Sequence, residues 1–131
     1  MDQQVKEQTH AFAHEAAKIA AELHCTDIVV IDLQGQSPAT DFFVIATGTS
    51  ERQMRTVCDE ISAMGRERDF PRLGRAGYDQ GRWILLDFVS VVVHLFDEEY
   101  REFYDLDNLW ADVEIKRIEE NEDDSQLGIT N

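Results

Sequence analysis

The chain has few cysteines and no long hydrophobic run. Its 131 residues include only Cys25 and Cys58, which lack the Cys-x-x-Cys spacing of a metal or redox motif. We therefore expect two small buried side chains in a protein of a reducing compartment. The apolar runs are only a few residues long, and the polar N-terminal segment is typical of a helix rather than of a secretion signal. These features predict a soluble, cytosolic protein without a membrane span.

Positive charge is also scarce. Acidic residues number 27 and basic residues 12, which gives a formal net charge of −15. Because nucleic-acid backbones are bound by Lys and Arg, this composition argues against a protein that wraps RNA or DNA and favours a basic protein as partner. The arginines of the segment 66–82 locally outnumber its acids. We interpret that segment as a solvated helix end and loop rather than an RNA contact.

The hydrophobic periodicity predicts one α/β domain, and the length is sufficient for a single hydrophobic core. We expect helices at 3–24, 51–67 and about 98–104, a helical turn at 107–110, and strands at 27–33, 41–47, 70–80, 82–88 and 91–96. The order α-β-β-α-β-β-β-α predicts a mixed five-stranded sheet flanked by helices. Residues 112–131 are acidic with few large apolar side chains, so we expect a frayed or disordered tail beyond a domain of residues 1–111.

The segment 81–110 carries the most informative pattern. Strands 82–88 and 91–96 flank Val89 and Ser90, which predicts a hairpin in which residue 88 faces 91 and residue 85 faces 94. One face is then wholly apolar: Ile84, Leu86, Phe88, Val91, Val93 and Leu95. The other face holds Trp83, Leu85, Asp87, Val92, His94 and Phe96. It is either an accessible working surface or a second core layer with a buried pair of His94 and Asp87.

Catalytic patterns in this sequence are incomplete. Gly48, Thr49 and Ser50 precede a helix and form a candidate anion site, although a glycine turn with a Ser50 cap explains them equally simply. A nucleotidyltransferase would place Asp-x-Asp on the next strand, whereas the only such motif lies at 105–107, where helix capping accounts for it. No nucleophile accompanies the histidine and aspartate of the hairpin. We predict no catalytic residue and no cofactor.

Metal ligands are also incomplete. His10 and His14 stand four residues apart on the first predicted helix and could share a metal ion. No third ligand is spaced to join them, and the surrounding sequence is not that of a zinc protease. Exposed helix histidines are the simpler interpretation, so we predict no metal site.

Aromatic residues follow the hairpin at short intervals. Trp83, Tyr100, Tyr104 and Trp110 are interleaved with Arg101 and acids. These residue types are enriched at the buried centres of protein interfaces, because a large rigid side chain fills a pocket at low entropic cost. The alternative is that some of them, Trp110 above all, close the core.

Five segments together resemble the ribosomal silencing factor family, also called the Iojap or RsfS family: residues 27–32, 40–53, 81–88, 91–96 and 101–110. The resemblance covers about residues 8–111. It implies a nucleotidyltransferase-like α/β fold without a transferase role, which binds large-subunit ribosomal protein fourteen and blocks the joining of the two subunits when nutrients are short. One departure is Val89 and Ser90, which stand where the family tends to have a Gly-containing turn.

The residues and the resemblance together predict a partner-binding surface made of Trp83, Leu85, Asp87, His94, Tyr100 and Tyr104. The role of His94 stays open between contacting the partner and supporting Asp87. Two further hypotheses remain. The chain could be a nucleotide-binding enzyme that uses the turn at 48–50, or the apolar patch around Trp83 could pair with a second copy in a homodimer.

Overall fold

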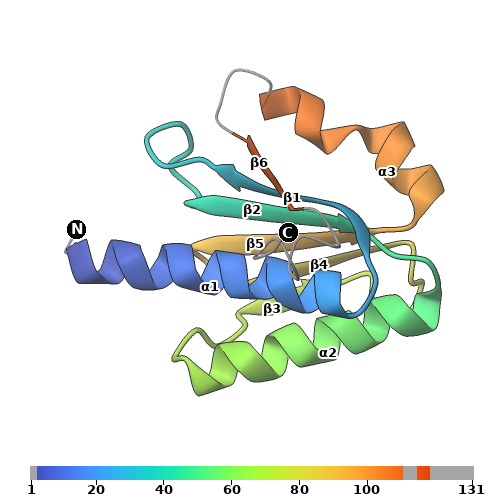
Figure 1. Ribbon diagram of the computed structural model, residues 1–131, viewed down its shortest axis with the longest axis horizontal. Coiled ribbons are helices and arrows are strands. Elements are labelled where there is room, and N and C mark those ends of the chain that lie inside the picture. The colour runs from blue at the N-terminus through green and yellow to red at the C-terminus, as the bar shows by residue number, and fades with distance from the viewer. Residues whose placement is uncertain (1–2, 111–114, 119–131) are drawn as a thin grey trace, which may run out of the picture.

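A computed structural model describes residues 3–110 and 115–118, and shows a six-stranded sheet with helices on both faces (Figure 1). The helices are α1 (Gln3–Glu22), α2 (Glu51–Glu67) and α3 (Glu98–Tyr104), followed by the 3-10 helix η1 (Leu106–Trp110). The strands are β1 (Thr26–Asp32), β2 (Phe42–Thr47), β3 (Gly74–Ala76), β4 (Trp83–Asp87), β5 (Val91–Phe96) and β6 (Ile115–Ile118). The sheet order is β3-β4-β5-β2-β1-β6, with β2 and β5 parallel and the other neighbours antiparallel.

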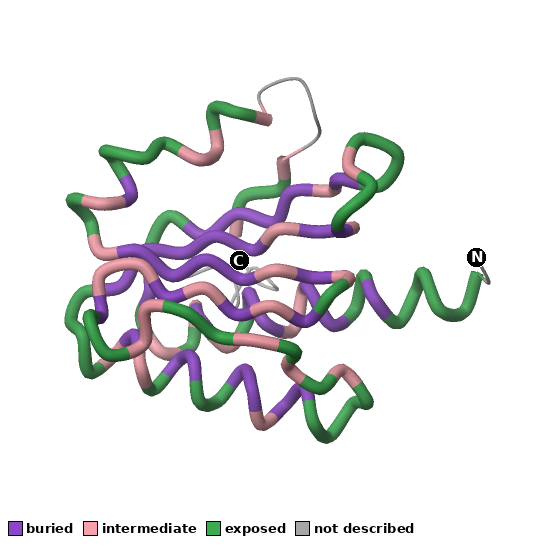
Figure 2. The backbone as a smooth tube through the Cα atoms, turned by 180° about the vertical axis from the view of Figure 1, so that it is seen from behind, coloured by how far each residue is buried: buried purple, intermediate pink, exposed green. Residues whose placement is uncertain are grey.

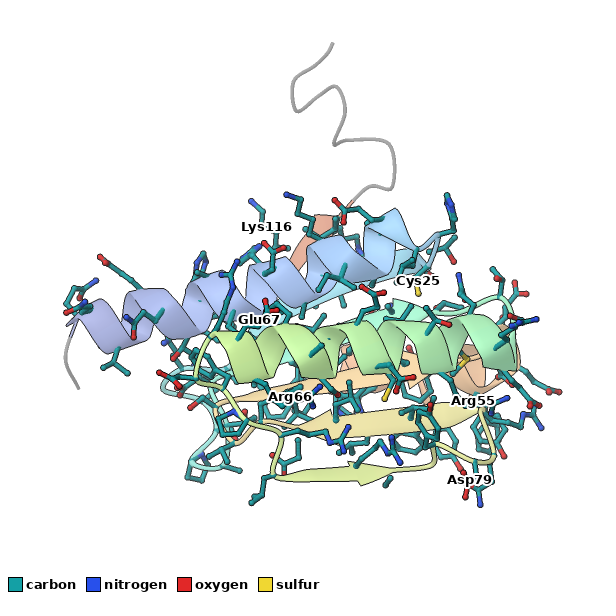
Figure 3. The ribbon with its side chains drawn as sticks, turned by 90° about the horizontal axis from the view of Figure 1, so that it is seen from below. Cys25, Arg55, Arg66, Glu67, Asp79 and Lys116 are labelled. Atoms are coloured by element: carbon teal, nitrogen blue, oxygen red, sulfur yellow. The ribbon has the colours of Figure 1, made fainter. Side chains whose placement is uncertain are left out.

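The main core lies between the sheet and the pair α1 and α2 (Figures 1 and 3). α1 buries Phe12, Ala16 and Ala20 there, as its helical spacing predicts. Val5 of the same helix is exposed, because the N-terminal end of α1 extends past the sheet (Figure 2). None of the described helices is both long and apolar enough to cross a membrane.

α2 begins where its sequence predicts. The Ser50 side chain accepts a hydrogen bond from the Gln53 amide at 3.0 Å, and the Gln53 side chain accepts one from the Thr49 amide at 2.6 Å. The side-chain amide of Gln53 also donates to the Leu23 carbonyl at 2.8 Å, so the cap ties α2 to the end of α1. The predicted Ser50 cap is therefore confirmed, and Gln53 completes a capping box whose return bond goes to Thr49 instead of Ser50.

The predicted hairpin register is confirmed. Leu85 pairs with His94, Trp83 pairs with Phe96, and the Phe88 amide donates to the Val91 carbonyl at 2.9 Å. The wholly apolar face of the hairpin lines the main core. β3 is a strand of three residues at the sheet edge, shorter than the strand predicted at 70–80.

The sheet has one strand more than predicted. β6 pairs with the outer edge of β1 over residues that we expected to form a frayed helix. Ile115 and Ile118 are three residues apart and therefore point to opposite faces of the sheet, where each packs on one of the two cores. Two isoleucines three residues apart would also suit one face of a helix. The segment forms a strand because the edge of β1 is free to pair with it. The remainder of the predicted tail lies outside the described residues.

Most arginines of the segment 66–82 contact the protein itself. Arg72 donates to the Ser62 hydroxyl at 2.9 Å, and the Arg75 guanidinium lies 3.7 Å from the centre of the Tyr78 ring. Arg66 stands at the C-terminal end of α2, far from Arg55 at its start (Figure 3). These contacts agree with a solvated helix end and loop.

Candidate functional site

The sheet face opposite α1 and α2 is a second core in one part and an accessible surface in another. Under α3 and η1, a smaller apolar core buries Val29, Ile31, Leu33, Ile45 and Phe96. Beyond it, the hairpin side chains Leu85, Asp87 and Val92 stay half-buried. The two interpretations offered by the sequence therefore apply to neighbouring parts of one face.

An aromatic cluster joins the two parts. We define it as Trp83, Tyr100, Phe103 and Tyr104. The Trp83 ring is half-buried and lies 4.9 Å from Phe96 and 4.7 Å from Tyr104, measured between ring centres. Tyr104 is 44% exposed and Phe103 is 77% exposed, with 4.9 Å between their rings. Exposed aromatic side chains grouped in this way are typical of a protein-docking site.

His94 supports the cluster from beneath and does not reach the surface. Its side chain is 5% exposed, and its Nδ1 accepts a hydrogen bond from Trp83 Nε1 at 3.1 Å. Asp87 instead accepts the Val89 backbone amide at 2.8 Å. The buried pair of His94 and Asp87, one of the two alternatives that the sequence left open, is therefore not formed, and the His94 side chain is buried. Burial lowers the pKa of His94 to about 4, so the ring is neutral near pH 7.

Small residues leave the accessible part of the face open. β3 places Gly74 opposite Asp87 and Ala76 opposite Leu85, so neither neighbour covers these two predicted contact residues. The structure thus brings Leu85 and Asp87 onto the same face as Trp83, as the alternation predicted.

Arg82 fixes α3 beside the hairpin. Its Nε donates to Asp97 at 2.7 Å, a second guanidinium nitrogen pairs with Glu99, and the guanidinium lies 4.2 Å from the centre of the Tyr100 ring. Asp97 in turn caps α3 by accepting the Tyr100 amide at 2.8 Å. The hydrogen bonds that Arg82 donates to Asp97 and Glu99 raise its pKa. This network holds Tyr100 beside Tyr104, whose ring centre lies 5.5 Å away.

A buried arginine, which the sequence did not single out as structural, holds η1 against the sheet. Arg101 is 8% exposed and donates to both carboxylate oxygens of Asp107, at 3.2 and 3.0 Å, and to the Thr47 hydroxyl at 2.9 Å. The sequence feature that could have indicated this buried ion pair is the Asp-x-Asp motif at 105–107. Its first aspartate ends α3 in a left-handed conformation, and its second is the partner of Arg101.

An acidic crevice of about 1100 Å³ lies on the other side of α3, at the C-terminal ends of the parallel strands β2 and β5. Its acids are Asp27, Asp97, Glu98, Glu99, Glu102, Asp105 and Asp107. The arginines that line it, Arg101 and Arg117, both contact Asp107. The crevice therefore attracts positive charge.

The candidate anion site opens into this acidic crevice. The Gly48 amide donates to the Phe96 carbonyl at 2.8 Å, and the Thr49 amide donates to Gln53. Two backbone donors that an anion would need are thus engaged by the protein, and the neighbouring carboxylates repel negative charge. The geometry favours the simpler interpretation, a glycine turn with a helix cap.

The two helix histidines contact each other without forming a recognisable metal centre. The rings of His10 and His14 lie 4.3 Å apart between centres. Burial lowers the pKa of His14, and His10 and Lys116 add to the shift. Among residues 3–110 and 115–118, no group of three His, Cys, Asp or Glu side chains is placed to bind a metal ion.

The model of one protein family, described as ribosomal silencing factor during starvation (RsfS), matches residues 6–129 of this chain. The chain belongs to this family. Ribosomal silencing factor RsfS of Bacillus subtilis is 32% identical over 104 residues, which cover 79% of this chain and 88% of that protein. RsfS of Haemophilus influenzae is 37% identical over 86 residues, which cover 66% and 84% of the two chains. Membership in the RsfS family confirms the resemblance found in the sequence.

Two solved structures share the fold of this RsfS-family chain. A crystal structure from Chromobacterium violaceum matches with a TM-score of 0.72 at 27% identity, over 85% of this chain and 88% of that one. A crystal structure from Bacillus halodurans matches with a TM-score of 0.65 at 30% identity, over 83% and 95%. Both matches support the mixed α/β architecture.

Proposed function

We propose that this RsfS-family chain represses translation by binding the large ribosomal subunit through large-subunit ribosomal protein fourteen and blocking the joining of the small subunit when nutrients are short. Family membership supports a ribosome-associated silencing role. The observation that carries the proposal is the solvent-accessible aromatic cluster of Trp83, Tyr100, Phe103 and Tyr104.

The surface around the cluster suits a basic protein partner. The cluster and half-buried Leu85 supply an apolar centre, which is where interfaces gain most of their free energy. The acidic crevice and the net charge of −15 would attract a basic ribosomal protein and repel exposed ribosomal RNA. Asp87 would lie at the rim. We therefore expect little direct RNA contact.

The proposed mechanism is steric and needs no catalytic step. A protein bound where the small subunit must sit raises the cost of joining by the free energy of its own displacement. The proposal includes the nucleotidyltransferase-like fold without a transferase role that the resemblance implies. It also places the chain in the cytoplasm, away from membranes, without a metal ion or cofactor. The same apolar surface would allow a homodimer when no ribosome is bound.

Substituting the tryptophan tests the proposed surface. We expect Trp83→Ala to weaken binding to purified large subunits by about 2 kcal/mol or more, roughly 30-fold, as truncation of an interface anchor does. Sucrose-gradient co-sedimentation measures binding, and the proportion of joined ribosomes measures silencing. Val5→Ala, an exposed apolar truncation on α1 at the opposite side of the sheet, is the matched control.

The joining assay decides the proposal as a whole. Added wild-type protein should shift joined ribosomes toward separate subunits. An unchanged proportion of joined ribosomes at saturating protein would contradict the proposed function. Normal binding by Trp83→Ala, with an unchanged circular dichroism spectrum, would remove Trp83 from the surface.

A further inference from the structure

The hydrogen bond between Trp83 and His94 defines the protonation of the histidine ring. An indole N–H can only donate, so His94 Nδ1, which lies 3.1 Å from Trp83 Nε1, must be the acceptor. The neutral ring therefore carries its proton on Nε2. That atom is buried and has no hydrogen-bond partner among the described residues. The single hydrogen bond found for the His94 ring is thus the one that holds Trp83.

The surroundings of His94 are apolar and fix its orientation. Its ring centre lies 4.7 Å from Phe43, with the two planes at 69°, and 6.1 Å from Phe96 in a stacked arrangement. Burial alone accounts for the lowered pKa of His94. The neutral His94 ring is therefore buried against the sheet, and its one polar contact with the described residues is the hydrogen bond that it accepts from the Trp83 indole.

We propose that His94 is the positioning residue for Trp83: it binds the indole N–H within the protein, fixes the ring orientation, and leaves only apolar ring surface for the docking partner. This inference rests on the proposed function, in which Trp83 anchors the interface. It specifies the chemistry of the partner. The patch that meets Trp83 is apolar and supplies no hydrogen-bond acceptor to the indole.

The positioning part is tested on the free protein by ¹H–¹⁵N correlation spectra of the indole and imidazole groups. The wild-type protein should show an unprotonated His94 Nδ1 and a slowly exchanging Trp83 N–H. His94→Asn keeps an acceptor oxygen where Nδ1 stands and should preserve the protected indole signal. His94→Phe keeps the ring but removes the acceptor, so the indole signal should shift and exchange rapidly. A protonated Nδ1 in the wild-type protein would overturn the positioning role.

The docking part is tested by affinity for purified large subunits. Trp83→Phe keeps an aromatic ring but lacks the N–H, so it also loses the positioning bond to His94. It should therefore lose about fivefold, as one hydrogen bond does, and far less than the roughly 30-fold loss of Trp83→Ala, because the partner makes no bond to that N–H. His94→Phe should lose about fivefold, the effect expected from one hydrogen bond. His94→Asn should restore the affinity. Once Trp83→Phe is present, His94→Phe should have no further effect, since the donor is already absent.

The outcomes separate this inference from the proposed function. A loss with Trp83→Phe as large as with Trp83→Ala would show that the partner needs the indole N–H, and would overturn the inference. Additive losses in the double variant would show that His94 acts independently of Trp83, and would also overturn the inference. Absence of wild-type binding to large subunits would overturn the proposed function and the docking part together, whatever the spectra of the free protein show.

Discussion

Replacing Val89 by glycine is expected to stabilise the fold by about 1 kcal/mol. Val89 has a φ of +74°, and the Ser90 amide donates to the Phe88 carbonyl at 2.9 Å, so the hairpin closes through a tight three-residue turn. A side chain in the left-handed region costs about 1 to 2 kcal/mol, and a β-branched one is an outlier there. Glycine relieves this strain but loses about 0.5 to 1 kcal/mol in chain entropy. Because Val89 is 54% exposed, little burial is lost.

Thermal and urea denaturation measure the effect. With about 2.1 cal/mol/K of unfolding entropy per residue, a gain of about 1 kcal/mol raises the Tm by about 4 °C. Ser90→Gly is the matched control, because Ser90 lies one residue further along and outside the left-handed region. It should destabilise the hairpin by about 0.5 to 1 kcal/mol. Equal destabilisation by Val89→Gly and Ser90→Gly would refute the assignment of strain to Val89.

Three further substitutions or conditions test other parts of the structure. Gly77 has a φ of +78°, and an added Cβ would overlap the Trp83 carbonyl. Gly77→Ala should therefore lower the free energy of unfolding, measured in urea, by more than about 2 kcal/mol. Gly74→Ala is the control, because a Cβ at Gly74 meets open space and the change should be near neutral. Arg101→Leu leaves the partly buried Asp107 carboxylate with only the distant contact to Arg117, at 4.0 Å, among the described residues, and should cost about 2 kcal/mol or more; an unchanged urea midpoint would contradict the role given to this arginine. The neutral form of His94 stabilises the fold fully above about pH 6.5, and this contribution is lost as the pH falls toward the folded pKa of about 4, because the unfolded chain takes up a proton that the folded one excludes. Unfolding free energies should therefore fall by roughly 2 kcal/mol more between pH 7 and pH 5 in wild type than in His94→Asn, and equal pH slopes would contradict the burial of a neutral ring.

Local patterns predicted the hairpin and α2 because short-range chemistry determines them. The two-residue gap at Val89 and Ser90 fixes which strand residues face each other, and the alternation then assigns both faces. Ser50 and Gln53 locate the start of α2 through hydrogen bonds within one helical turn. Neither feature depends on distant parts of the chain.

The partner of His94 could not be predicted from the same register. His94 lies opposite Leu85 and has two diagonal neighbours on its face, Trp83 and Asp87, at similar expected distances. The sequence favoured the aspartate because of its charge. In the fold, Asp87 lies beside the turn and caps the Val89 amide, so the buried ring pairs with the uncharged indole at lower desolvation cost.

Long-range structure accounts for the other errors. β6 exists because the outer edge of β1, more than eighty residues earlier in the chain, offers unpaired backbone groups. The burial of Arg101 likewise depends on Asp107 and Thr47, which converge only after α3 folds back over the sheet. Arginine is usually found at the surface, so the sequence alone does not predict that Arg101 is buried against Asp107 and Thr47.

The two sides of α3 carry different parts of the proposed recognition. One side adds Tyr100 and Tyr104 to Trp83, an uncharged surface whose contacts would govern how slowly the partner leaves. The other side adds Glu98 and Glu102 to the acidic crevice, where charge would govern how fast a basic partner arrives. Because Arg82 and Arg101 fix the same short helix at both ends, the aromatic and acidic surfaces keep a constant relative position. Loss of either arginine would therefore disturb both surfaces together, whereas loss of Trp83 would affect the apolar one alone.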